Sequence, residues 1–274
     1  MKPLSPRRRR MYVWLFVILF FVSVPLALLY AGGYRYKAGF GLVQTGGMYL
    51  FVPYNDATIF LGANEIGRSG FLNRGFYIDD LAPSVYEVRV ERHGSLEWTR
   101  RLIVEPQVVT RAEVVLPPEK PKLVRLTRGG ITSSTTQAVS ADVYDSYSAS
   151  FRRYATSTIG RGNDDVVALV ERANVYVRWS DAGRKPPDNF CGTPSECVEE
   201  LAVEDGNETA LSVALFDGGV VYATREGGVY FSEIDVRPSP VTMVIYRKAS
   251  AGARVVNGNL IIKDGSVLYE VEGF

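Results

Sequence analysis

Residues 11–31 read MYVWLFVILFFVSVPLALLYA and contain no Asp, Glu, Lys or Arg. A helix of this length rises about 31 Å, which is close to the hydrocarbon thickness of a bilayer. Pro25 lies inside the stretch and predicts a kink or bend toward its outer third. Tyr12 and Trp14 lie near one end and Tyr30 near the other, where amphipathic rings favour the membrane interface. The stretch therefore predicts a transmembrane helix.

Basic residues precede this stretch, namely Lys2 and the run Arg7–Arg10. The positive-inside rule keeps such an end in the cytoplasm, and Arg35 and Lys37 on the other side are too few to reverse it. We therefore expect residues 1–10 to form a cytoplasmic basic tail. The helix would then be a single-pass anchor in the lipid bilayer of the cell membrane, with the body outside the cytoplasm.

A cleaved signal peptide is the main alternative, because it shares the basic start. The apolar run is longer than the usual h-region of about 7–15 residues. The exit LALLYAGG also lacks a small-x-small cleavage site, since Leu29 occupies the −3 place before Ala31. An uncleaved anchor is therefore favoured, and a buried core helix is a third alternative.

The composition favours β structure and argues against a nucleic-acid surface. The chain has 274 residues, enough for one anchor and one or two domains, and is rich in Tyr, Val and Gly. Its net charge is +1, from 31 basic and 30 acidic residues. Because the first ten residues carry +5, residues 11–274 carry −4. A mildly acidic body does not suit nucleic acid.

The segment after the anchor predicts a series of strands. Residues 32–40 form a spacer rich in Gly and Tyr. The expected strands are Gly47–Pro53, Ala57–Gly62, Ser84–Glu91, Leu96–Glu105 and Val108–Leu116. Tyr86, Val88 and Val90 share one face of their strand, whereas Arg100 interrupts the apolar face of the next one. The prolines at 117, 118 and 121 mark a domain boundary.

This segment contains ATIFLGANEIG followed by IDDLAPSVYEVRVERHGSLEWTRRLIVEPQVVTRAEVVL. Over residues 41–118 the pattern resembles the PEGA domain, a small β-sandwich of bacterial and archaeal surface proteins. Leu81, Ala82 and Pro83 fit the family's leader, Tyr86, Val88 and Val90 fit its strand, and Leu116 fits its end. Ser84 and Val85 stand where the family usually has glycine, and Tyr54–Ala57 replaces the PEGA tetrapeptide. The resemblance implies a binding or spacer module without catalytic residues.

Residues 122–274 predict a second β-rich domain. Residues 122–165 are less regular, and Ser133–Ser150 is expected to be strand or loop. Strands then recur between tight turns at Glu171–Asn174, Asp217–Gly219, Glu226–Gly228, Asn257–Gly258 and Asp264–Gly265. This spacing resembles propeller blades, and at about 40 residues per blade it allows three or four. We expect a mostly β protein whose distal domain is sandwich-like or an incomplete or small propeller.

The two cysteines, Cys191 and Cys197, lie in NFCGTPSEC. Outside the cytoplasm such a pair predicts a disulfide that closes a short loop and stabilises by about 2 kcal/mol. Free thiols are the alternative. A metal site is not expected, because the single histidine, His93, is distant and there is no second cysteine pair.

The chain offers few groups for catalysis. His93 lies at an expected hairpin tip. The acidic pairs Asp79–Asp80, Asp164–Asp165 and Glu199–Glu200 are adjacent residues, which point to opposite faces of a strand. Gly160–Asp165 lacks the spacing of a calcium loop and predicts a turn, and Asn207–Thr209 is a short glycosylation sequon. We therefore expect no catalytic, cofactor or metal residues.

Aromatic residues are the candidates for ligand contact, because they are rigid and amphipathic. We single out Trp98, Trp179, Tyr176, Tyr222 and Tyr230. The competing interpretation places Trp98 and Trp179 in the cores of their strands.

These patterns predict a membrane-tethered extracytoplasmic surface protein without catalysis. Its role would be binding, adhesion or structure, and its partner a cell-wall polymer or an envelope protein. The alternatives are an envelope hydrolase acting on glycans, with two carboxylates in a cleft, and a scaffold subunit of an envelope complex.

Overall fold

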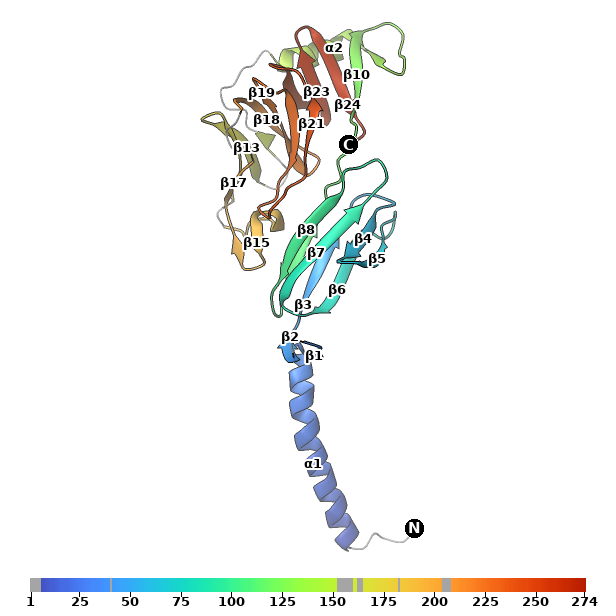
Figure 1. Cartoon of the computed structure of the whole chain (residues 1–274), viewed down its shortest axis with the longest axis vertical. Helices are drawn as coiled ribbons and strands as arrows, with labels where there is room; N and C mark the ends of the chain where they lie inside the picture. The colour runs from blue at the N-terminus through green and yellow to red at the C-terminus, as the bar shows by residue number, and fades with distance from the viewer. Residues whose placement is uncertain (1–5, 40, 152–159, 162–164, 182, 204–207) are drawn as a thin grey trace.

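A computed structural model describes residues 6–39, 41–151, 160–161, 165–181, 183–203 and 208–274. Within these ranges the chain is mostly β, as the sequence predicts. A long N-terminal helix leads to two β modules, one beyond the other (Figure 1). The proximal module comprises strands β3–β9, and the distal module comprises β10–β24 with a second helix.

Helix α1 (Pro6–Ala31) contains the apolar stretch. It is long and apolar enough to cross a membrane, and its apolar window is not buried against the body. This exposure excludes the interpretation as a buried core helix. Pro25 lies inside the helix without ending it.

The end of α1 is tied to the proximal module by hydrogen bonds. The expected spacer is instead a hairpin of β1 (Tyr34–Lys37) and β2 (Gly41–Gln44). The carbonyl of Gly32 accepts a hydrogen bond from Gln107 Nε2 (3.1 Å), and that of Gly33 accepts one from Thr45 N (2.9 Å). Arg35 stacks on Tyr30 of the helix and pairs with Asp80 of the module (3.1 Å). The junction is therefore a joint with several contacts.

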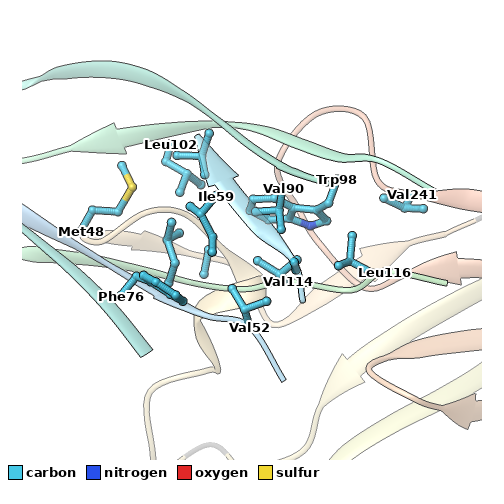
Figure 2. Packing of buried hydrophobic residues seen from close by; sticks show 14 of the residues in the cluster. Met48, Val52, Ile59, Phe76, Val90, Trp98, Leu102, Val114, Leu116 and Val241 are labelled. Carbon is cyan, nitrogen blue, oxygen red and sulfur yellow. The ribbon is translucent and has the colours of Figure 1, made fainter. Parts of the chain in front are cut away.

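The proximal module is a pair of sheets around one core. Its strands are β3 (Gly46–Phe51), β4 (Thr58–Leu61), β5 (Asn64–Arg68), β6 (Gly75–Leu81), β7 (Ser84–Glu91), β8 (Trp98–Val104) and β9 (Val109–Glu113). One sheet has the order β6-β3-β9 and the other β5-β4-β7-β8. Inward side chains of both sheets fill the core, which includes Met48, Ile59, Val90 and Leu102 (Figure 2).

The distal module contains three larger sheets. Its strands are β10 (Lys122–Arg128), β11 (Thr136–Val139), β12 (Gly160–Arg161), β13 (Val166–Glu171), β14 (Asn174–Trp179), β15 (Cys191–Thr193), β16 (Glu196–Cys197), β17 (Glu200–Ala202), β18 (Ala210–Phe216), β19 (Gly219–Thr224), β20 (Val229–Glu233), β21 (Thr242–Tyr246), β22 (Gly252–Val256), β23 (Asn259–Asp264) and β24 (Val267–Glu272). The sheets have the orders β12-β13-β14-β17, β18-β19-β20-β21 and β11-β10-β24-β23-β22, and β15 pairs with β16.

Successive sheets of the distal module pack face to face. One apolar cluster joins the first sheet to the second, and another joins the second to the third. Strand β10 comes from the start of the module, yet it lies beside the last strand, β24. The first and last parts of the module thus share one sheet. The pairing within the three sheets is antiparallel except between β10 and β11, which are parallel.

Helix α2 (Ala141–Ser150) occupies part of the segment expected to be strand or loop. The side chain of Ser140 caps it by accepting a hydrogen bond from Val143 N, and Asp142 lies in its first turn. Tyr147 and the following Phe151 pack on the third sheet. Ser and Tyr have modest helix propensity, so the burial of these rings outweighs the local preference.

The segment that connects the two modules contributes side chains to the cores of both. Val114 and Leu116 pack in the core of the proximal module, whereas Val115 packs in a cluster of the distal module. Successive extended residues point to opposite sides, so one short segment supplies both cores. Leu96 N also donates to the carbonyl of Pro117 (2.9 Å). The two modules are therefore not joined by a free linker.

The β13–β14 turn predicts a stabilising substitution. Arg172 (φ 49°) and Ala173 (φ 71°) form this two-residue turn, and both have left-handed backbones that side chains disfavour. We expect Ala173→Gly to raise the free energy of unfolding by about 1 kcal/mol, because glycine adopts positive φ without strain. Urea denaturation of the full-length chain measures the change.

Ala202→Gly is the matched control, since Ala202 is an exposed residue of strand β17. It should lower stability by about 0.5–1 kcal/mol, as glycine does in regular structure. Equal effects at both positions would show that the turn carries no such strain.

Candidate ligand-binding cleft

A cleft of about 1210 Å³ lies between the two modules. The proximal module contributes residues of β3 and β9, and the distal module contributes η1 (Asp188–Phe190), the β18–β19 turn and the end of β20. Its lining is Tyr49, Phe51, Arg111, Ala112, Glu113, Val115, Val166, Pro187, Asp188, Asn189, Leu215, Phe216, Asp217, Gly218, Gly219, Glu233, Ile234, Asp235, Val255, Gly258 and Phe274. The site therefore exists only where the modules meet.

The floor of the cleft is the outer face of strands β3 and β9. Side chains alternate along β3, so Met48 and Leu50 enter the core while Tyr49 and Phe51 face outward. The parallel pairing of β3 with β9 sets Tyr49 beside Arg111 and Phe51 beside Glu113. This register brings aromatic and charged side chains together on one flat surface.

The opposite wall carries the turn between β18 and β19. Asp217 (φ 47°) and Gly218 (φ 74°) are the two turn residues, which is the backbone of a type I′ hairpin. Phe216 precedes the turn and makes an edge contact with Phe274, with ring centroids 5.3 Å apart. The lining of the cleft thus includes a carboxylate from this turn and the rings of Phe216 and Phe274.

A buried ion network joins the modules beside the cleft. Arg100 of β8 pairs with Glu233 of β20 and lies 3.5 Å from Asp235. Arg237 donates from Nε and Nη2 to the two oxygens of Asp235, each at 2.7 Å. These four side chains are at most 4 % exposed. Two positive and two negative charges are therefore removed from water together.

Hydrogen bonds satisfy the remaining acceptors of this network. Trp98 Nε1 donates to Glu233 Oε1 (2.8 Å), and Val241 N donates to Glu233 Oε2 (3.0 Å). Arg237 Nη1 donates to the carbonyl of Arg111 (3.1 Å), so the network also crosses back to the proximal module. Val241 itself lies at the Trp98 end of the proximal core (Figure 2).

Burial and charge oppose each other at Glu233. Burial raises the pKa of this carboxyl, while Arg100 and the donors Val241 N and Trp98 Nε1 counteract the rise. Such a network stabilises less than its contacts suggest, because removing charges from water costs several kcal/mol per ion. Its main consequence is specificity, because Arg100 and Asp235 each contact two opposite charges and this arrangement requires one geometry.

Two carboxylates of the cleft raise the pKa of Tyr54. Burial raises the pKa of Tyr54 to about 12, and the carboxylates of Asp217 and Glu113 add to the rise. Burial also raises the pKa of Asp217, and it is the single cause among the described residues. Asp217 and Glu113 come from different modules, and both line the cleft.

The predicted pair Cys191 and Cys197 forms a disulfide. It closes the small β15–β16 hairpin, and β15 lies close to β8 of the proximal module. Ser195 Oγ of this hairpin donates to a carboxylate oxygen of Glu105 and lowers its pKa. The hairpin is thus a second contact between the modules.

The aromatic candidates lie away from the cleft. Trp98, Trp179 and Tyr222 are buried, so they leave no ring surface for a ligand, and the core interpretation of the two tryptophans describes their position. Tyr230 stacks on Tyr222 and donates its hydroxyl to Glu208 (3.1 Å). Tyr176 is half-buried in β14.

The other residues singled out in the sequence do not converge. Asp80 pairs with Arg35 at the helix joint, and Glu200 pairs with Arg178 on an exposed strand. His93 is exposed between β7 and β8. Residues 162–164 of the glycine-rich segment and Asn207 of the sequon lie outside the described residues. In the described part of the chain, no group of three or more His, Cys, Asp or Glu side chains is placed to hold a metal ion.

Comparison with protein-family models and with curated proteins finds no match to this chain. The interpretation of the cleft therefore rests on its geometry.

The sequence gives one signal for this site. Arg100 was visible as a charge on an apolar strand face, and a buried charge requires a partner. Its partners, Glu233 and Asp235, lie more than a hundred positions away. Tyr49 and Phe51 look like ordinary members of an apolar run, because only the sheet pairing reveals which face they occupy.

The ion network predicts a large loss of stability in Arg100→Leu. This change leaves Glu233 buried without its guanidinium, which should cost about 3–5 kcal/mol in the free energy of unfolding at neutral pH. The loss should shrink as pH falls, because Glu233 has a raised pKa and becomes neutral on protonation. Urea denaturation at several pH values measures both effects.

Arg101→Leu is the matched control on the same strand. Arg101 is exposed and makes only a 4.0 Å pair with Glu87. We expect a change within about 0.5 kcal/mol at any pH. A similar loss in both variants, or a loss at Arg100 that does not vary with pH, would contradict the role given to the network.

Proposed function

We propose that this chain is a membrane-tethered surface protein whose body binds a ligand in the cleft between its modules, outside the cytoplasm and without catalysis. The ligand would be a cell-wall polymer or an envelope protein. The observation that carries the proposal is the cleft itself, because residues of both modules line it and a buried ion network fixes their arrangement. Pre-organised clefts between domains are common sites of ligand binding.

The anchor and its orientation follow from the N-terminal helix. The helix has the length and apolarity of a single span, and the Arg7–Arg10 run favours a cytoplasmic N-terminus. The disulfide between Cys191 and Cys197 supports a body in an oxidising compartment. The contacts of Gly32, Gly33 and Arg35 would hold the body at a set angle to the bilayer.

The proximal module would act as a PEGA-like spacer that also forms half of the cleft. Its two sheets around a single core support this proposal. The spacer would hold the cleft away from the membrane surface, where a polymer or a partner protein can reach it.

Ligand retention by the full-length chain in lipid nanodiscs tests the proposal. Intact mass of the membrane-extracted protein first establishes that residues 11–31 are retained. The wild type is then incubated with cell-wall material and envelope extract of the source cell, and bound material is quantified. Tyr49→Ala with Phe51→Ala should reduce specific retention at least tenfold, because the floor of the cleft loses its aromatic surface.

Tyr36→Ala with Phe71→Ala is the matched control, since both aromatic rings are highly exposed outside the cleft. This variant should retain as much material as the wild type. Equal retention by the two variants, or no specific retention by the wild type, would refute the proposed binding function.

A glycan hydrolase is the second candidate function. It is favoured by Glu113 and Asp217, two carboxylates of the cleft with different environments, since burial raises the pKa of Asp217. In that case Asp217→Asn would retain the polymer but stop the release of new reducing ends. Polymer that stays intact with the wild type would exclude this candidate.

A further inference from the structure

The β1–β2 hairpin at the end of the N-terminal helix has two different sides. Arg35 of β1 lies on the side that contacts the protein, because it stacks on Tyr30 of α1 and pairs with Asp80 of the proximal module. Tyr36 follows Arg35 in the strand, so its side chain points to the opposite side. Leu42 is the cross-strand partner of Tyr36 and shares that side. These two side chains form one surface, the Tyr36–Leu42 patch.

The Tyr36–Leu42 patch is open to the surroundings. Tyr36 is 82 % exposed and Leu42 is 57 % exposed. Tyr34 shares this side at the base of the hairpin, but its ring lies against Gly32, where an added Cβ would come within 3.5 Å of the ring. A two-stranded hairpin is only marginally stable in water, because it has too few contacts to form a core. A surface that packs on the patch would therefore stabilise the hairpin.

The length of α1 sets the level of the hairpin relative to a bilayer. Residues 11–31 span about 31 Å as a helix, close to the hydrocarbon thickness of about 30 Å, and the headgroup layers extend a bilayer to about 40–45 Å. Gly33 N donates to the carbonyl of Tyr30 (3.1 Å), so the hairpin begins within one turn of the end of the apolar stretch. Figure 1 shows the hairpin between α1 and the strands of the proximal module. In a membrane this position is the level of the lipid headgroups.

The composition of the hairpin suits this level of the bilayer. Residues 32–44 contain two tyrosines and two basic residues and no Asp or Glu. Tyrosine rings favour the headgroup layer, because one end of the ring is apolar and the other is polar. Acidic side chains would be repelled by the lipid phosphates, whereas Arg35 and Lys37 are attracted to them. Lipid is therefore the partner that matches the exposed side of the hairpin.

We propose that the Tyr36–Leu42 patch lies in the headgroup layer of the bilayer that α1 crosses, so that the hairpin is a second contact of the protein with lipid. This inference rests on the membrane anchor of the proposed function and extends it. Interfacial side chains help to set the tilt and rotation of a spanning helix, so this contact would restrict how the body tilts on the membrane. The patch contributes no residue to the lining of the cleft.

Tryptophan fluorescence of the full-length chain in phosphatidylcholine nanodiscs with brominated acyl chains tests this inference. Trp14→Phe first removes the tryptophan of the helix and leaves Trp98 and Trp179, which are buried in the body. Tyr36→Trp is then introduced, and the emission of the Trp14→Phe chain is subtracted. Bromine near the headgroup should reduce the added emission by about twofold or more, and bromine near the end of the acyl chain should reduce it less, because the ring lies at the interface. Leu42→Trp should respond in the same way.

Phe71→Trp in the same Trp14→Phe chain is the matched control. Phe71 is 78 % exposed, nearly as much as Tyr36, but it lies between β5 and β6 at the end of the proximal module away from α1. Its emission should be the same with brominated and ordinary lipid. Phe21→Trp lies in the middle of the apolar stretch and reports on the anchor, so bromine near the end of the acyl chain should quench it most.

Equal quenching of Tyr36→Trp and Phe71→Trp would overturn the inference. Stronger quenching of Tyr36→Trp by bromine near the end of the acyl chain would also overturn it, because the ring would then lie in the hydrocarbon layer. If Phe21→Trp is quenched and Tyr36→Trp is not, the anchor of the proposed function stands and the inference alone fails. If Phe21→Trp is not quenched either, both fail.

Discussion

The guanidinium of Arg100 lies between the carboxylates of Glu233 and Asp235, and this contact crosses the boundary between two β modules. None of these charges has access to water, so each must keep its partner. The connecting segment adds a second constraint, because Val114 and Val115 point into different cores. The modules are thus held in one relative position, which also fixes the shape of the cleft between them.

This constraint explains how two β modules can form a cleft of defined shape. Neither module has the whole site, since the floor belongs to β3 and β9 and the opposite wall to a turn of the distal module. Rigid placement lowers the entropic cost of binding, because the ligand does not have to bring the walls together. The hydrogen-bonded joint at Gly32 and Gly33 extends the same rigidity to the helix.

The coarse fold could be predicted from sequence because it depends on local patterns. The apolar stretch after Arg10 marks the helix, the alternation in Ser84–Glu91 marks a strand, and Asp217-Gly218 marks a turn. Helix α2 could not be predicted, because its helix propensity is modest and the burial of its rings, including Tyr147, is known only from the packed structure.

The cleft could not be predicted, because its parts are brought together by long-range pairing. The register that sets Phe51 beside Glu113 joins strands more than fifty positions apart. Residue type alone marks the aromatic residues as candidates for ligand contact, but Trp98 and Trp179 are buried in the cores. Arg100 was the exception, since a charge on an apolar face is visible in sequence, although its partners are not.

The buried ion network should make the two modules one rigid unit, and an inter-module distance tests this rigidity most directly. Spin labels at Glu65→Cys in β5 and Asp142→Cys in α2 occupy exposed positions on the two modules, and the native disulfide keeps the other cysteines bonded. Double electron–electron resonance on the full-length chain should give a single narrow distance distribution. A broad or two-peaked distribution would show modules that move independently and would contradict the account.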